Sequence, residues 1–321
     1  MHSLARTFVF AASVLIAAPA AFALDRVKVA VGQGTTFDTA FLIAAKGTGV
    51  FEKHGLDVEF LTTSGGGETL QAVISGSVDV GIAAGTTGVM GAFAKGAPVR
   101  VLSAQDTGAD ETFLYVPANS PIRSFSEATG KTVAFSTVGA STYTFVTGLA
   151  DVYKVKPKFT PTGGIPATYA ATMSGQIDIG WAAFPFGAQE QKDGKIRILA
   201  WGKEVKDLHS QTIRVNITHV GALNGRKDVL RRFMAAYAEA LDWAYASKDA
   251  PKAIAALLGA AETDVEATRT NYIVRSQLQM HDILALERSM QDAIEFKYIA
   301  APLTNEQIAE LFQMRNILAP K

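Results

Sequence analysis

The chain has 321 residues, of which 48% are hydrophobic and 19% charged, so it can bury two cores of ordinary domain size. Thirty basic residues balance thirty acidic ones, and this zero formal charge excludes a strong field for nucleic acid or an anionic membrane surface. The absence of cysteine excludes disulfides, thiolate metal sites, a cysteine nucleophile and a lipid-anchored N-terminal cysteine.

Residues 1–23 have the organisation of an export signal. Arg6 and the amino terminus supply positive charge, an apolar run follows at 8–18, and Ala21-Phe22-Ala23 fits the small-x-small cleavage pattern. The alternative is a membrane anchor, but this run is shorter than the roughly 20 residues that a membrane span needs. We therefore predict cleavage near Ala23 and a mature protein in the bacterial periplasm that is not a lipoprotein.

From residue 26 the chain alternates between strand-like runs and helix-like stretches. Apolar runs predict strands at 27–32, 56–63, 78–84 and 99–104, separated by helices near 39–55, 64–77 and 85–96. The same order recurs, with strands predicted at 131–137, 156–161 and 176–183 and helices near 138–153 and 163–175. This alternation favours parallel βαβ units, because parallel neighbours need a crossover connection.

One short phrase occurs twice. ISGSVDVGIAAG at 74–85 and MSGQIDIGWAAF at 173–184 share six of twelve positions at an offset of 99. The repeat predicts two lobes of similar build. Asp79 and Asp178 occupy the same place in the two copies, directly before a strand, and we interpret them as turn residues at the strand start.

The loops that follow the predicted strands share one chemistry. They are rich in glycine, serine and threonine and contain no lysine or arginine. Open α/β sheets bind ligands at the carboxyl ends of their strands, and helix starts there offer backbone N–H groups to a negative group. The sequence thus predicts a site for a small anionic head, held mainly by main-chain amides.

Large rings distinguish the second copy from the first. Trp181 and Phe184 stand where the first copy has Ile82 and Gly85, and Phe186 follows shortly after. These rings predict an aromatic wall beside the anion, which favours an organic ligand. The alternative for Trp181 is a place in the core.

Four segments carry a resemblance to a known family. SPIRSFSEATGKTVAF at 120–135, with GVFEKHGLDVEF, SGSVDVGIA and SGQIDIGW, resembles the periplasmic substrate-binding proteins of ABC importers, in the nitrate, sulfonate and taurine branch related to the thiamine-pyrimidine-precursor group. The resemblance covers nearly the whole mature chain. It implies a two-lobed α/β fold of the type II periplasmic-binding-protein class, with mainly parallel sheets flanked by helices and a double-crossover hinge.

The resemblance also implies boundaries and a site. Lobe 1 is expected at 24–109 and 212–321, and lobe 2 at 110–211, with a returning strand at 213–221 followed by helices. Together with the strand-end loops and the aromatic wall, it predicts these ligand-binding residues: Gln33, Thr35, Thr36, Phe37, Ser64, Gly65, Gly66, Gly85, Thr86, Thr87, Glu111, Thr137, Gly139, Ala140, Ser141, Thr142, Trp181 and Phe184.

The expected hinge segment contains three carboxylates, Asp106, Asp110 and Glu111. They either solvate the hinge loop or meet an amine on the ligand, and Glu111 is the best candidate for the second role because it directly precedes a strand. Farther along, Arg226, Lys227, Arg231 and Arg232 form either a permease contact or a solvated helix face.

The predicted function is capture of a small organic anion or zwitterion, of the sulfonate or taurine kind, and its delivery to a membrane permease. The protein is expected to be a monomer with no cofactor, no metal and no nucleic-acid partner. The five histidines lack metal-ligand spacing, and no phosphate-loop or nucleophile-elbow motif is complete. A ligand-dependent sensory or docking protein of the same fold, or an exported enzyme, are the alternatives.

Overall fold

The computed structural model describes residues 23–318, so the predicted signal at 1–23 lies almost entirely outside the described residues. Its strands are β1 Asp25–Gly32, β2 Leu56–Thr63, β3 Val80–Gly85, β4 Val99–Thr107, β5 Thr112–Pro117, β6 Thr132–Phe135, β7 Lys158–Pro161, β8 Gly180–Ala183, β9 Ile196–Trp201 and β10 Thr212–His219.

The helices are α1 Phe37–Ala45, α2 Val50–Lys53, α3 Gly66–Ile74, α4 Thr86–Ala94, α5 Ser141–Tyr153, α6 Ile165–Met173, α7 Ala188–Lys192, α8 Val220–Gly225, α9 Lys227–Ala246, α10 Ala250–Leu258, α11 Glu262–Asn271, α12 Leu286–Glu295, α13 Asn305–Leu311 and α14 Met314–Leu318. Single 3₁₀ turns occupy Lys46–Thr48, Phe125–Glu127, Gly202–Glu204 and Lys206–Ser210. None of the helices between residues 23 and 318 has the length and apolar character that a membrane crossing requires.

The first sheet has the strand order β2-β1-β3-β10-β4. β1 pairs in parallel with β2 and β3, whereas β10 runs antiparallel to both β3 and β4. All six residues of β3 are buried, as expected for a central strand covered on both faces. The parallel pairing predicted from the βαβ pattern thus holds for three of the five strands.

The second half of the molecule repeats this arrangement. β6 and β7 pair in parallel, and β8, β5 and β9 form an antiparallel sheet in the order β8-β5-β9. A parallel bridge between Val133 and Ile179 joins the two pieces, which gives the overall order β7-β6-β8-β5-β9. Four of these five strands run in one direction, so the expected mainly parallel sheet is confirmed, and β5 is the exception because it runs antiparallel to both of its neighbours.

The two aspartates of the repeated phrase tie equivalent strands together. The Asp79 carboxylate accepts the backbone N–H of Lys28 in β1 at 2.9 Å, and the Asp178 carboxylate accepts that of Thr132 in β6 at 2.8 Å. Both aspartates therefore act as strand-start residues, as predicted. The repeat marks two copies of one architecture.

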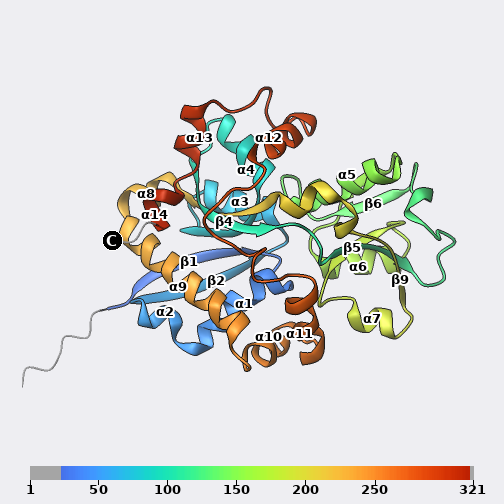
Figure 1. The fold of residues 1–321 in the computed structure, drawn as a ribbon, viewed down its shortest axis with the longest axis horizontal. Coiled ribbons are helices and arrows are strands. Elements are labelled where there is room, and N and C mark those ends of the chain that lie inside the picture. Colours follow the sequence, from blue (N-terminus) through green and yellow to red (C-terminus); the bar gives the residue numbers. More distant parts are fainter. Residues whose placement is uncertain (1–22, 319–321) are drawn as a thin grey trace, which may run out of the picture.

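Figure 1 shows the middle of the chain, drawn green to yellow, gathered on one side, and both ends of the described chain gathered on the other. One hydrophobic core cluster runs from Ala109 to Ile213, while two others combine residues before 103 with residues after 214. These clusters support our proposed lobes, 24–109 with 212–321 and 110–211. The chain crosses between the two sides from β4 to β5 and again from β9 to β10 (Figure 1).

The C-terminal segment is helical, as expected, and α9 is its longest helix. α9 buries one face against the first sheet's helices, and Phe233 stacks on Phe51 with ring centroids 6.1 Å apart. Thr304 and Gln307 form a capping box at the start of α13. Two of the basic residues at the start of α9 make ion pairs within the protein, Arg226 with Asp79 and Arg232 with Asp25, both at 2.5 Å.

Candidate functional site

A small polar cavity lies where the carboxyl ends of the strands of both sheets meet. From the first side it is lined by Gly32, Gln33, Thr36, Asp38, Gly66, Ala83 and Arg214; from the second side it is lined by Ser136, Ala140, Ser141, Thr142, Trp181 and Ala183. Its volume is about 20 Å³, which is room for about one water molecule. A larger solute can enter only if the two sides separate.

The backbone around this cavity is held in an uncommon conformation. Gln33, directly after β1, and Ala83, within β3, have left-handed φ angles of 58° and 63°. Such a conformation costs a residue with a side chain about 1–3 kcal/mol and is concentrated at functional sites. The turn at Gln33 is fixed by the Thr36 and Thr39 hydroxyls, which donate to its carbonyl at 3.0 and 2.7 Å.

Glycines allow the loops of the two sides to touch backbone to backbone. A Cβ atom at Gly85 or Gly88 would lie 2.3 or 2.2 Å from the carbonyl oxygen of Gly139. The backbone N–H of Gly67 donates to the Thr137 hydroxyl at 3.1 Å across the same boundary. The glycine-rich loops therefore serve close approach of the two sides, in addition to any ligand contact.

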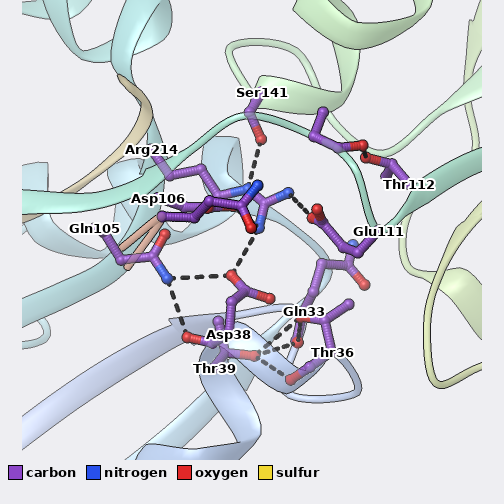
Figure 2. Close-up of polar contacts among 12 residues, drawn as sticks. Gln33, Thr36, Asp38, Thr39, Gln105, Asp106, Glu111, Thr112, Ser141 and Arg214 are labelled. Atoms are coloured by element: carbon purple, nitrogen blue, oxygen red, sulfur yellow. Dashed lines mark hydrogen bonds and ion pairs between the residues drawn. The ribbon is translucent and has the colours of Figure 1, made fainter. Parts of the chain in front are cut away.

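A buried arginine occupies the wall of the cavity (Figure 2). Arg214, near the start of β10, pairs through Nη1 with Asp38 at 2.7 Å and with Asp106 at 3.0 Å. Its Nη2 pairs with Glu111 at 3.0 Å, and its Nε donates to the Ser141 hydroxyl at 3.0 Å. The arginine thus connects α1, the end of β4, the residue before β5 and the first residue of α5.

The electrostatics of this network are unbalanced. Burial raises the pKa of Asp106 well above its usual range, and burial also raises the pKa of Glu111. Burial lowers the pKa of Arg214, but the three neighbouring carboxylates outweigh this effect and raise it above the ordinary value of an arginine. The guanidinium therefore stays charged, and the carboxyl groups outnumber it.

Two polar atoms on the cavity wall have no hydrogen-bond partner among the described residues. They are the indole Nε1 of Trp181 and the Oδ1 atom of Asp38. Trp181 is 1% exposed and Asp38 is fully buried. Because buried polar groups are satisfied in almost all native structures, these two atoms are available to pair with a ligand or an ordered water.

The structure brings together part of the predicted site. Seven predicted residues line the cavity: Gln33, Thr36, Gly66, Ala140, Ser141, Thr142 and Trp181. Five more form contacts between the loops beside it: Ser64, Gly65, Gly85, Thr137 and Gly139. Contact of these residues with a solute remains our prediction.

The remaining predicted residues lie elsewhere. Phe37 packs in the core against Tyr245, and the Thr86 hydroxyl donates to the Thr212 carbonyl at 2.8 Å. Thr87 is buried without lining the cavity. Thr35 lines a separate groove of about 390 Å³ with Phe186.

The predicted aromatic wall is divided in the structure. Trp181 faces the cavity, but the Phe184 ring stacks on Trp201 at 5.4 Å and lies 4.7 Å from Tyr272. Phe184 therefore joins a separate aromatic stack between the two sides and leaves Trp181 as the cavity's aromatic residue. The two large residues of the second copy therefore have different roles in the structure.

Two further expectations need correction. Asp106 and Glu111 do not solvate the hinge, because each is only 1% exposed and pairs with Arg214; Asp110, by contrast, is half-buried and lies 3.5 Å from His209. The expectation that no basic residue lies at the site was also wrong. Arg214 reaches the cavity from a strand whose apolar neighbours predicted only burial.

Sequence reasoning missed the two charged residues of the cavity. Asp38 directly follows the predicted loop residue Phe37, and Arg214 is the single charged residue in the buried run Thr212–Thr218. A lone charge in a strand buried on both faces needs a partner. That rule would have marked Arg214 as part of a buried ion network, without identifying its partners.

Among residues 23–318, no group of three or more histidine, cysteine, aspartate or glutamate side chains is placed to hold a metal ion. The arginine occupies the position between the three buried carboxylates. The arrangement can thus pair with donor and acceptor groups of a bound molecule.

Comparison with solved structures reveals the same fold in several proteins. The alkanesulfonate-binding protein SsuA from Xanthomonas axonopodis pv. citri, bound to MOPS, matches with a TM-score of 0.73 and 18% identity over 89% of this chain and 97% of that one. The nitrate-binding protein NrtA from Synechocystis PCC 6803 matches with a TM-score of 0.68 and 13% identity, over 91% and 86% of the two chains.

A Candida albicans protein described as having the generic periplasmic binding protein fold, the CA3427 gene product, matches with a TM-score of 0.72 and 14% identity, over 93% and 99%. These matches confirm the two-sided α/β fold class. No curated protein sequence matches the chain.

The family model described as NMT1/THI5 like matches residues 36–250, which is more than half of the chain. The matched region contains both copies of the repeated phrase and every residue that lines the cavity except Gly32 and Gln33. The resemblance inferred from the four sequence segments is thereby confirmed, and the chain belongs to the NMT1/THI5-like family.

Proposed function

We propose that this protein is a periplasmic solute-binding component of an ABC importer. It captures one small organic anion or zwitterion between its two sides and presents the closed complex to a membrane permease. The observation that carries this proposal is the polar cavity lined from both sheets, with two buried polar atoms left unsatisfied on its wall. The sulfonate- and nitrate-binding neighbours support the same role.

Closure is the mechanism we infer for capture. The loops at Gly67, Gly88 and Gly139 are in direct contact, and the cavity they enclose is too small for an organic solute to enter unaided. Opening must therefore precede binding, and a solute that contacts both sides favours the closed state through those contacts. Within the predicted ligand class, the excess of carboxylates around Arg214 favours a zwitterion over a simple anion.

We infer binding without chemical transformation. The chain contains no cysteine, and its histidines are dispersed along the sequence. Arg214 and its carboxylates are bound to one another, which leaves no described nucleophile paired with a base on the cavity wall.

A thermal-shift screen of the mature protein against small sulfonates, amino acids, carboxylates, nitrate and pyrimidines tests the proposal. A solute present at one hundred times its dissociation constant adds about 2.7 kcal/mol of stability. Recovery of the bound solute unchanged, shown by mass spectrometry, supports binding alone, whereas a converted product supports the enzyme alternative. Loss of uptake of the same solute in a deletion strain supports transport, and unchanged uptake supports the sensory alternative.

A further inference from the structure

Carboxyl groups outnumber the guanidinium in the ion network beside the cavity. One guanidinium, that of Arg214, faces the three carboxyl groups of Asp38, Asp106 and Glu111, whose side chains are at most 2% exposed. In a buried place a charge without a partner is costly, because water cannot screen it. A purely anionic ligand would bring further acceptor atoms to this network, while a cationic group would bring donors to its carboxyl oxygens.

Arg214 has little capacity left for an anion. A guanidinium has five N–H groups, of which three donate to Ser141, Asp38 and Glu111, and Asp106 lies 3.0 Å from Nη1 as an ion-pair partner. Bidentate recognition of a sulfonate or carboxylate requires two N–H groups side by side. Most of the N–H groups of Arg214 are therefore taken by the protein's own side chains, and the arginine acts first as a partner of the carboxyl groups.

Asp38, in contrast, keeps one carboxylate oxygen without a hydrogen-bond partner among the described residues. Its Oδ2 atom accepts from Arg214 at 2.7 Å and from the Gln105 amide at 3.1 Å, while Oδ1 has no partner among the described residues. Figure 2 shows interactions drawn to only one of the two carboxylate oxygens. Across the cavity, the indole N–H of Trp181 is a donor without an acceptor. Two residues that line the cavity thus carry one unpaired acceptor and one unpaired donor.

We propose that Asp38 recognises a positively charged nitrogen of the ligand, which donates to Oδ1, and that Trp181 Nε1 donates to an acceptor atom of the same molecule. The chemical class is a small ammonium compound that also carries an anionic or carbonyl oxygen. This inference rests on the proposed solute-binding function and narrows its ligand class. It assigns Asp38 as the specificity-determining residue of the cavity.

Matched pairs of probes test the assignment with the unmodified protein. Each pair contains an ammonium compound and an analogue in which a methyl group replaces the ammonium: taurine with propane-1-sulfonate, β-alanine with butanoate, and 4-(aminomethyl)benzoate with 4-ethylbenzoate. Isothermal titration calorimetry at pH 7 measures both members. In any pair that binds, we expect the ammonium member to bind at least tenfold more tightly, which equals about 1.4 kcal/mol.

Two variants distinguish direct contact between Asp38 and the ligand from the electrostatic effect of the whole ion network. Asp38→Asn keeps the shape of the side chain and should reduce the preference for the ammonium member to less than threefold. Glu111→Gln removes one negative charge from the same network at a residue that does not line the cavity, and it should keep most of the preference. Equal loss in both variants would overturn direct recognition by Asp38.

The outcomes distinguish this inference from the function on which it rests. Equal or tighter binding of the methyl analogues, or binding of only anionic probes such as nitrate, overturns the role of Asp38 and leaves solute capture intact. Failure of every probe in both this panel and the wider screen overturns both proposals. Because the matched-pair comparison uses the native chain, it remains decisive if a variant does not fold.

Discussion

Replacement of Gly88 by alanine should separate closure from folding. Gly88 lies in the first turn of α4, and its φ is not left-handed, so alanine fits the helix itself. The added methyl group would lie 2.2 Å from the carbonyl oxygen of Gly139 and 2.6 Å from its Cα atom. Since Gly139 belongs to the opposite side of the cavity, this clash acts on the closed state alone.

The magnitude follows from the geometry. An ordinary contact begins at 3.4 Å, so the 2.2 Å approach requires the two loops to move apart by about 1.2 Å. Overpacking of this kind costs about 1–3 kcal/mol, and a cost of that size lowers affinity about 5- to 150-fold. Alanine is favoured over glycine within a helix by up to about 1 kcal/mol, so resistance to unfolding should not fall.

Three measurements check this prediction. Calorimetry with the solute found in the screen should report the loss of affinity, and small-angle scattering should show a smaller decrease in radius of gyration on adding solute than in the native protein. The urea midpoint should be unchanged or higher. Gly225→Ala, where nothing lies within 4 Å of the new methyl group, is the matched control. Native affinity and native compaction in Gly88→Ala would refute closure through these loops.

Three further substitutions test the networks. Arg214→Met leaves the buried carboxylates without a counter-charge and should cost about 3–5 kcal/mol in urea unfolding. Because burial raises the pKa of Asp106 above its ordinary 3.8, the folded state keeps a proton that the unfolded chain releases. The free energy of unfolding therefore falls as pH rises from about 3.8 through that raised pKa, and Asp106→Asn should flatten this slope in urea midpoints measured across the range. Asp178→Ala removes two hydrogen bonds to Thr132 and should cost about 1–3 kcal/mol, whereas an unchanged midpoint would contradict the role of the repeat.

The local parts of the fold were predictable because short-range patterns determine them. The strand at 56–63 was predicted with its exact bounds, since its apolar residues alternate and glycine precedes it. The repeated phrase correctly predicted equivalent strand starts at Asp79 and Asp178. The strand β9 was not predicted, because Ile196–Trp201 has buried residues only at intervals and lies at the edge of its sheet.

Strand direction was less predictable than strand position. The βαβ pattern correctly indicated parallel pairing where a helix connects neighbours, as between β1 and β2. β5 and β10 each arrive after the chain has crossed from the other side, and both run antiparallel to their neighbours. A local pattern carries no information about such a crossing, so the one reversed strand in each mainly parallel sheet was not predicted.

The charged part of the site was hidden for the same reason. Arg214 and Asp38 are 176 positions apart, and each stands alone in an apolar segment. What joins them is the crossing itself: β4 ends beside Asp106, β5 begins just after Glu111, and β10 brings Arg214 back between them. The network therefore joins the end of β4 to the start of β5, and through Asp38 and Arg214 it also lines the cavity. A ligand that neutralises Asp38 must act on the same ion pairs that hold the two crossovers together. Binding of the solute and the position of the hinge are therefore electrostatically coupled.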